Sequence, residues 1–231
     1  MKESPKKEGI LLINKNPGYS SFYLVKILRK LSGIQKIGHA GTLDPFATGV
    51  MVMLIGRSYT KLSNQLIENH KEYIATLKIG ESTDTFDCEG KKTSSSSAVP
   101  SLEEIDKAVL CFQGNCTQTP PMFSAKKIQG KKLYQLARKG VEIDRQPIRI
   151  QIKTEVLDYT YPFLKLKISC SKGTYIRTIA HDLGGKLGTG AHLVALTRTV
   201  SGDFQLKDCI DAKTLSDPSF LYSNHLIKSV G

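Results

Sequence analysis

The sequence predicts an α+β fold with a mixed, mainly antiparallel β-sheet flanked by helices. Strand patterns with a period of two residues follow one another as a hairpin between residues 148 and 170, and helical patterns interrupt the strands at irregular intervals. A doubly wound parallel sheet would alternate strand and helix regularly. No repeat is visible at periods of about 20 to 50 residues, so a solenoid or a propeller is not expected.

The first elements in chain order are a strand and a helix. Residues 10–14 (ILLIN) predict a short buried strand, followed by the turn Lys15-Asn16-Pro17-Gly18. A helix then begins at a cap, Ser20 or Ser21, and ends at Gly33. Its predicted buried face carries Leu24, Ile27, Leu28 and Leu31. We expect the opposite face to be solvated, with Lys26, Arg29 and Lys30.

The next stretch, residues 38–49 (GHAGTLDPFATG), is rich in glycine and threonine and contains a proline, which predicts a shaped loop rather than a helix or a central strand. It leads into a predicted buried strand at residues 51–55 and a short helix at residues 59–66. Residues 71–80 alternate between apolar and polar, which predicts a strand with Tyr73 at the head of its inward row. An inward tyrosine on a strand ordinarily serves in packing.

The middle of the chain is polar. Residues 81–90 carry four acidic side chains without apolar periodicity and lack the spacing of an EF-hand calcium site, so they predict a polar loop. Residues 93–97 (TSSSS) predict a linker. Ser101 and Glu104 form a capping box, which predicts the start of a helix.

The second half of the chain returns to strands and one helix. Residues 148–156 and 164–170 predict two strands joined by a turn at residues 158–162. A helix capped by Thr174 and stopped by Gly188 follows, and residues 191–200 predict the last strand. The chain beyond Asp208 is short and weakly patterned.

Size and composition indicate a globular protein. The 231 residues can bury a sizeable core, and 40% of them are apolar. There is no run of about 18 apolar residues, and no apolar stretch follows the charged N-terminus. We therefore expect neither a membrane span nor a signal peptide, and we place the protein in the cytoplasm.

Metal and disulfide chemistry have no readable pattern. The five cysteines form no CxxC pair, and the five histidines lie at least eleven residues apart. We predict reduced thiols, with no zinc site and no disulfide framework.

The charge balance favours a polyanionic partner. The sequence contains 33 Lys and Arg against 21 Asp and Glu, a net charge of +12. Residues 121–155 hold nine basic and three acidic side chains, with Phe123 and Tyr134 among them. This concentration is typical of a projecting element that binds phosphates. The alternative is an ordinary solvated helix at residues 133–139.

Asp44 is the one acidic side chain of the loop at residues 38–49, and Pro45 biases its backbone towards an extended conformation. An aspartate before a proline is more often a turn residue that bonds its own backbone. Function nevertheless concentrates in loops joined to buried segments, which keeps a catalytic role for Asp44 open.

The stretch GHAGTLDPFATGV resembles the signature of the TruB family of tRNA pseudouridine synthases. The segments KGTYIRT and PPMFSAKKIQGKKLYQLARKG resemble two further parts of that family, the second being its RNA-gripping thumb. The resemblance implies a pseudouridine synthase fold and cofactor-free conversion of uridine to pseudouridine at position 55, in the T-loop of tRNA. It also implies that Asp44 is the catalytic nucleophile.

The resemblance implies roles for five further residues. Arg177 would pair with Asp44 and keep it ionised, because arginine cannot lose its proton. Tyr73 would stack on the uracil once it has left the RNA helix, and Tyr175 would lie beside Asp44 and Arg177. Leu196 would complete the apolar wall, and His39 would fill the position that the base leaves. Judged alone, Arg177 would be a surface residue and His39 a structural hydrogen-bonder.

For domains and partners we expect a catalytic domain at residues 8–210 with a thumb at residues 120–150. Residues 211–231 would be a short tail without the full C-terminal RNA-binding domain that many bacterial members carry. The expected partner is the T-arm of tRNA, bound by a monomer without an obligate protein partner. The turn NKNPG and Tyr59 depart from the family's usual residues.

Three rival functions remain. An RNA chaperone could fold tRNA with the same basic surface and no turnover. A synthase of the same fold could act on ribosomal RNA. A nucleotide hydrolase is poorly supported, because the sequence contains no GxxxxGK[ST] loop.

Overall fold

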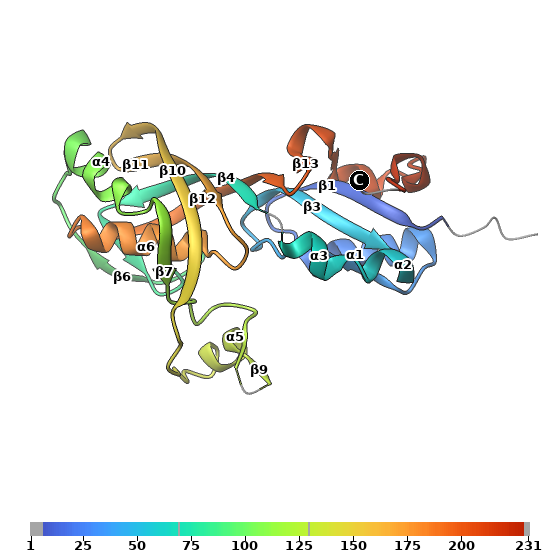
Figure 1. Ribbon diagram of the computed structural model, residues 1–231, viewed down its shortest axis with the longest axis horizontal. Coiled ribbons are helices and arrows are strands. Elements are labelled where there is room, and N and C mark those ends of the chain that lie inside the picture. The colour runs from blue at the N-terminus through green and yellow to red at the C-terminus, as the bar shows by residue number, and fades with distance from the viewer. Residues whose placement is uncertain (1–6, 69, 129, 229–231) are drawn as a thin grey trace, which may run out of the picture. The chain divides into compact units, whose positions relative to one another are not determined.

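The computed structural model describes residues 7–68, 70–128 and 130–228 (Figure 1). The chain divides into two compact units, each described by itself. Unit 1 comprises the chain up to Tyr73 and from Leu196 onward, and unit 2 comprises Ile74–Ala195. Strands β4 (Lys71–Ile79) and β12 (Ala191–Ser201) pass from one unit into the other. Helices around mixed, mainly antiparallel strands confirm the predicted α+β class.

The sheet of unit 1 has the strand order β14 (Ile210–Asp211), β1 (Gly9–Lys15), β3 (Thr48–Ile55), β12. Strands β1 and β3 are antiparallel, whereas β12 runs parallel to β3 at only two positions, Thr197↔Thr48 and Arg198↔Gly49. Two short strands extend this sheet, β2 (Ile37–His39) on β3 and β13 (Phe204–Gln205) on β12. The core of this unit consists of buried apolar residues, Ile10, Leu12, Ala40, Val50, Val52, Leu54, Leu66 and Phe204.

The predicted loop at residues 38–49 is shorter than expected. Gly38 and His39 belong to β2, and Thr48 and Gly49 belong to β3, so only residues 40–47 are loop. Composition suggested otherwise because glycine disfavours strands. Here Gly49 has φ +103 and lies against the backbone of Arg198, so the absence of a side chain is what allows β3 and β12 to pair.

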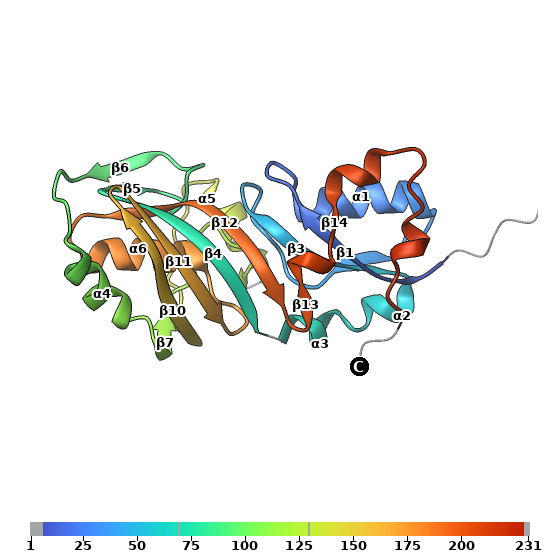
Figure 2. The ribbon, with the colours of Figure 1, turned by 90° about the horizontal axis from the view of Figure 1, so that it is seen from above.

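Helix α1 (Ser21–Ser32) confirms both predicted ends. The side chain of Ser20 accepts a hydrogen bond from the Tyr23 amide, and Gly33 closes the helix with φ +67. The predicted buried face is wrong at Leu31, which is 39% exposed. The buried stripe runs through Ser21, Leu24, Val25 and Leu28 and ends before Leu31. Figure 2 shows α1 beside β1 and β14.

Short helices complete unit 1. The single helix predicted at residues 59–66 is two, α2 (Arg57–Thr60) and α3 (Ser63–Glu68). The segment after β13 is better ordered than its weak pattern suggested. It contains three 3-10 helices, η1 (Leu206–Asp208), η2 (Ala212–Ser216) and η3 (Tyr222–His225), and Ile227 bridges to Ile10 of β1.

The sheet of unit 2 has the order β12, β4, β11 (Phe163–Cys170), β10 (Ile148–Thr160), β7 (Gly114–Gln118). The predicted hairpin of β10 and β11 is confirmed, but the turn is not residues 158–162. Strand β10 continues to Thr160 because the register shifts between Val156 and Asp158, which leaves Tyr161-Pro162 as the turn.

Helix α4 (Leu102–Leu110) has the predicted capping box of Ser101 and Glu104. Helix α6 (Ile176–Lys186) begins one residue later than predicted, with Tyr175 at its cap position and no side-chain cap. The Thr174 hydroxyl instead donates to the carbonyl of Ser171, so its predicted capping role is wrong.

The acidic and serine-rich segments are not a loop and a linker throughout. Strands β5 (Glu81–Thr83) and β6 (Lys92–Ser95) pair as a small antiparallel sheet. Lys92 lies 3.2 Å from the Glu81 carboxylate across the pair. A serine-rich sequence has little strand propensity, and it is the pairing partner that orders it.

The segment that the sequence predicts as a basic thumb, residues 120–150, lies between β7 and the first residues of β10, and we call it the thumb. It contains β8 (Lys127–Ile128), β9 (Lys131–Lys132) and α5 (Leu133–Ala137) and projects from the ends of β7 and β10 (Figure 1). Leu133 is fully buried and anchors it. Among the described residues of both units, no helix is long and apolar enough to cross a membrane.

Candidate active site

The loop at residues 40–47, which we call the Asp44 loop, joins β2 to β3 and is tied to the end of β1. Lys15, the last residue of β1, is fully buried. Its ammonium group donates to the carbonyls of Tyr19 and Pro45 at 2.7 and 2.9 Å. The Gly18 amide also donates to the Pro45 carbonyl, at 2.9 Å. The residue after Asp44 is therefore fixed by a buried cation.

The residue before Asp44 is fixed by α1. The hydroxyl of Ser21 accepts a hydrogen bond from the Leu43 amide at 3.1 Å and lies 3.2 Å from the Leu43 carbonyl, to which it donates. Within the loop, the Ala47 amide donates to the Asp44 carbonyl at 3.1 Å. Because both neighbours of Asp44 are held, its backbone has little freedom to move when a substrate arrives.

A second buried cation, Arg198, connects the start of the loop to the strand that follows it. Arg198 of β12 is 1% exposed. Its guanidinium donates to the Val50 carbonyl twice, from Nε at 2.8 Å and from Nη2 at 2.6 Å, and more weakly to the carbonyls of Gly41 and Thr42 at 3.3 and 3.4 Å. Among the described residues, no carboxylate lies within ion-pair distance of Arg198. Backbone carbonyl dipoles, with the Met51 sulfur at 3.4 Å from Nη2, therefore solvate this charge.

His39 borders the loop on β2 and is half-buried. Burial, reinforced by the positive charge of Arg198, lowers the pKa of His39 below its ordinary value. Its Nδ1 has no hydrogen-bond partner in the part of the chain that the structure describes. Burial therefore favours the neutral form of the ring, and Nδ1 is itself a buried atom.

Two of the predicted apolar residues lie on strands of unit 1. Tyr73 is 8% exposed on β4, so the prediction that it faces inward is confirmed. Leu196 is 6% exposed on β12, and its carbonyl accepts from the Thr48 hydroxyl at 3.3 Å. That bond joins Leu196 to Thr48, the first residue of β3 after the Asp44 loop.

Arg177 is buried in unit 2, not on the surface, with 5% of its area exposed. Its Nη1 lies 3.3 Å from a carboxylate oxygen of Asp87 and donates to the Thr85 carbonyl at 3.1 Å. Its Nη2 donates to the Phe123 carbonyl at 2.8 Å. One guanidinium thus connects α6, the turn after β5 and the base of the thumb.

Asp87 is a residue that the sequence did not indicate, because it appeared as one of four acids in a polar segment. It is 3% exposed. The Thr85 hydroxyl and the Glu89 amide donate to its carboxylate at 2.6 and 3.0 Å, and the Thr83 hydroxyl donates to its carbonyl at 2.7 Å. These bonds orient the carboxylate towards Arg177.

Tyr175 is positioned by a second residue that the sequence did not indicate. The side chain of Gln118, 3% exposed at the end of β7, pairs with the backbone of Tyr175. Gln118 accepts from the Tyr175 amide at 2.8 Å and donates to its carbonyl at 3.0 Å. This amide pair fixes the start of α6, two residues before Arg177.

The predicted site residues therefore fall into two groups. Unit 1 carries His39, Asp44, Tyr73 and Leu196, and unit 2 carries Tyr175 and Arg177. The pairing of Arg177 with Asp44 joins the two units and stays a prediction. Within residues 7–68, 70–128 and 130–228, no three side chains of His, Cys, Asp or Glu are grouped to hold a metal ion.

Comparisons with known proteins show the family of this chain. The family model described as "TruB family pseudouridylate synthase (N terminal domain)" matches residues 29–176, and "tRNA pseudouridylate synthase B C-terminal domain" matches residues 177–230. Proteins named tRNA pseudouridine synthase B are 59% identical in Protochlamydia amoebophila, over 94% of this chain and 83% of that protein, and 54% identical in Chlamydia pneumoniae, over 95% and 94%.

The fold resembles solved structures. A chain in the crystal structure of a Cbf5-Nop10-Gar1 complex matches with a TM-score of 0.70 and 27% identity, over 89% of this chain and 53% of that one. A chain in an H/ACA RNP bound to a substrate RNA matches with a TM-score of 0.68 and 24% identity, over 95% of this chain and 58% of that one, which supports the fold alone. This chain thus spans little more than half the length of either solved chain.

Proposed function

The chain belongs to the TruB family of pseudouridylate synthases, and we propose that it converts uridine to pseudouridine at position 55 in the T-loop of tRNA, with Asp44 as the nucleophile. The observation that carries the proposal is the fixation of Asp44 on both sides. Lys15 holds the carbonyl after it and Ser21 holds the residue before it. A carboxylate presented on a loop fixed in advance is what a nucleophile requires.

The reaction is an isomerisation. The bond between the ribose and N1 of the uracil breaks, the freed base rotates, and a bond forms between the ribose and C5. N1 gains a proton and C5 loses one, so no oxidant or reductant takes part. Asp44 acts by covalent attack on the ribose or on the ring, or by removing a ribose proton to form a glycal.

Arg177 is proposed as the cation that keeps Asp44 ionised. Burial alone would raise the pKa of a carboxyl group, and a neighbouring guanidinium opposes that effect. The bonds of Arg177 to Asp87, Thr85 and Phe123 support this role, because they set the orientation of the guanidinium before RNA binds.

The remaining residues are proposed to hold the base outside the RNA helix. Tyr73 stacks on the extruded uracil, and Tyr175 and Leu196 enclose it. Apolar and aromatic contacts recover part of the cost of unstacking, about a few kcal/mol. His39 fills the space that the base leaves, and its lowered pKa supports this role, because the neutral ring brings no charge that must be desolvated.

The proposed substrate is the T-arm, bound by a monomer. The thumb supports this choice, since it is a small projecting element with most of its charge positive. Contacts to phosphates and to the shape of a folded stem-loop fit such an element better than readout of base edges.

The test is conversion of a synthetic T-arm stem-loop by the purified protein without added cofactor. We expect pseudouridine at one uridine, no conversion by Asp44→Asn, and normal conversion by the control Asp203→Asn, which alters an exposed carboxylate of unit 1. Equal activity of Asp44→Asn would refute the nucleophile. Binding without conversion would favour an RNA chaperone, and conversion of ribosomal RNA fragments alone would favour the other synthase.

A further inference from the structure

The outward face of α1 combines exposed aromatic rings with unpaired positive charge. Phe22 is 54% exposed and Tyr23 is 44% exposed, both in the first turn. No residue of α1 is acidic, and its basic residues are Lys26, Arg29 and Lys30. We call Tyr19, Phe22, Tyr23, Lys26, Arg29 and Lys30 the α1 surface.

The basic groups of this surface contact a ring rather than carboxylates. The Lys26 ammonium and the Arg29 guanidinium lie 5.5 and 5.9 Å from the centre of the Phe22 ring. The rings of Tyr19 and Tyr23 meet edge to face, with centres 5.0 Å apart. Among the described residues, no carboxylate pairs with these cations. Lys26 and Lys30 are exposed, so their charge is available to an external anion.

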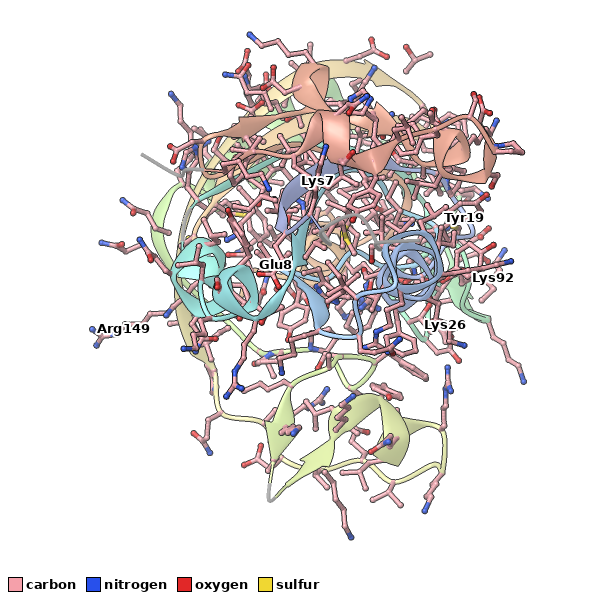
Figure 3. All side chains as sticks on the ribbon, turned by 90° about the vertical axis from the view of Figure 1, so that its right-hand side faces the viewer. Lys7, Glu8, Tyr19, Lys26, Lys92 and Arg149 are labelled. Atoms are coloured by element: carbon pink, nitrogen blue, oxygen red, sulfur yellow. The ribbon has the colours of Figure 1, made fainter. Side chains whose placement is uncertain are left out.

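The α1 surface begins at the Asp44 loop. Ser21 bonds to Leu43, and Lys15 links the Tyr19 carbonyl to the Pro45 carbonyl, so the first turn of α1 lies against both neighbours of Asp44. The helix leads away from that point at about 1.5 Å per residue, which puts Lys30 roughly 14 Å further along its axis than Ser21. Figure 3 looks along α1 and labels Tyr19 and Lys26 beside it.

We propose that the α1 surface binds the RNA strand next to the target nucleotide, with its cations on phosphates and its rings against an unpaired base. The inference rests on the proposed function for the nature of the ligand. RNA supplies both a row of phosphate anions and flat bases. The cations of the α1 surface can contact the phosphates, and its exposed aromatic rings can stack on a base. The distance from the Asp44 loop means that the contacted phosphates belong to the same stem-loop as the target uridine.

The first test measures the salt dependence of binding. The T-arm stem-loop is titrated at several NaCl concentrations against Asp44→Asn, which separates binding from turnover, and against Asp44→Asn with Lys26→Gln and Lys30→Gln added. Each lost phosphate contact makes the log–log slope shallower by about 0.7 to 0.9. We expect a slope shallower by about 1.4 to 1.8 for the two contacts, with several-fold weaker binding.

The matched control removes two charges elsewhere. Lys107→Gln and Lys165→Gln alter exposed lysines of α4 and β11, where neither residue contacts an aromatic ring in the described chain. The control should leave the slope near that of Asp44→Asn. An equal change in both pairs would mean that net charge alone matters, and would overturn the proposal.

The second test removes the rings. Phe22→Ser with Tyr23→Ser should weaken binding about five-fold or more without changing the salt slope, because stacking displaces no counterions. Both side chains are largely exposed, so the thermal midpoint should stay within a few degrees of the parent's. Unchanged RNA affinity would refute the proposal. If the same variant instead lost binding to phosphatidylglycerol vesicles, or lost self-association in sedimentation, the α1 surface would bind a membrane or a second copy of the chain rather than RNA.

The outcomes separate the inference from the proposed function. If the wild type converts no uridine but both α1 variants weaken stem-loop binding, the α1 surface binds RNA and the proposed reaction is wrong. If conversion proceeds and neither variant alters binding, the reaction stands and the inference fails.

Discussion

The close approach of β3 and β12 at Gly49 makes one substitution unusually informative. Gly49 has φ +103, and a Cβ built there would lie 2.2 Å from the carbonyl oxygen and 2.7 Å from the nitrogen of Arg198. Both are backbone atoms of the neighbouring strand, so no side-chain rotation relieves the collision. Gly49→Ala must push β12 away from β3, where they pair at only two positions.

Gly18→Ala is the matched control for the magnitude. Gly18 also has positive φ, +82, but a Cβ there would meet no atom within 4 Å. Gly18→Ala therefore adds only the strain of a side chain at positive φ, which lowers the unfolding free energy by about 1–2 kcal/mol. Gly49→Ala carries the same strain and also disturbs the bonds of Arg198 to Val50 and of Thr48 to β12. We expect a loss of about 4 kcal/mol or more.

The assay is thermal and urea unfolding of the two variants beside the wild type. At about 2–4 °C per kcal/mol for a chain of this size, Gly18→Ala should lower the melting temperature by about 2–8 °C and Gly49→Ala by at least about 8 °C. Gly49→Ala should also lose conversion of the stem-loop beyond its fraction unfolded, since Arg198 moves with β12. Equal melting temperatures for the two alanine variants would refute the reasoning.

Three further predictions concern the buried charges. Asp87→Ala removes the carboxylate beside Arg177 in a buried pair and should cost about 3–5 kcal/mol in urea unfolding, whereas Asp158→Ala, at an exposed position of β10, should cost less than about 0.5. Arg198→Lys cannot reproduce the forked donation to Val50, Gly41 and Thr42, so it should lower the unfolding free energy by about 1.5–3 kcal/mol. It should also lower the single-turnover rate of conversion more than the affinity for the stem-loop. An unchanged rate would mean that the bonds of Arg198 to the Asp44 loop do not support the reaction. The pKa of His39 is lower in the folded protein than in the unfolded chain, which therefore takes up the proton first as the pH falls below about 6.5. Stability should be full above that pH and decline as the pH falls below it, and His39→Gln should flatten this decline. Identical pH profiles for the wild type and His39→Gln would refute this linkage.

Features set by neighbouring residues could be predicted from the sequence. The Ser20 cap, the Gly33 end of α1 and the capping box of Ser101 each depend on contacts within a few positions, and all are present. The failures involve distant partners. Strand β6 is ordered by β5 across a turn, and Leu31 is exposed because the packing of α1, not its periodicity, decides where the buried stripe ends.

The same division holds for the site. Asp44 stood out through a distinctive local motif, but its supports could not be found in that way. Arg198 reaches Val50 across 148 positions, and Arg177 reaches Thr85 across 92. No local pattern marks such an arginine, because a buried guanidinium that bonds backbone carbonyls imposes no requirement on the side chains of its partners.

Those supports also explain why the Asp44 loop can contain so many small residues without being loose. A loop of small residues, with a glycine at position 41, has a large conformational entropy to lose. Here the loss occurs on folding, when Lys15, Ser21 and Arg198 form hydrogen bonds with its backbone carbonyls and amide. On the proposed function, RNA would meet a carboxylate whose position is already set, so binding energy from the thumb and the α1 surface would not be spent on ordering it. It follows that weakening the bonds of Lys15, Ser21 and Arg198 to the loop should lower the rate of the chemical step. Weakening the thumb or the α1 surface should instead lower RNA affinity, and the variants above measure the two effects separately.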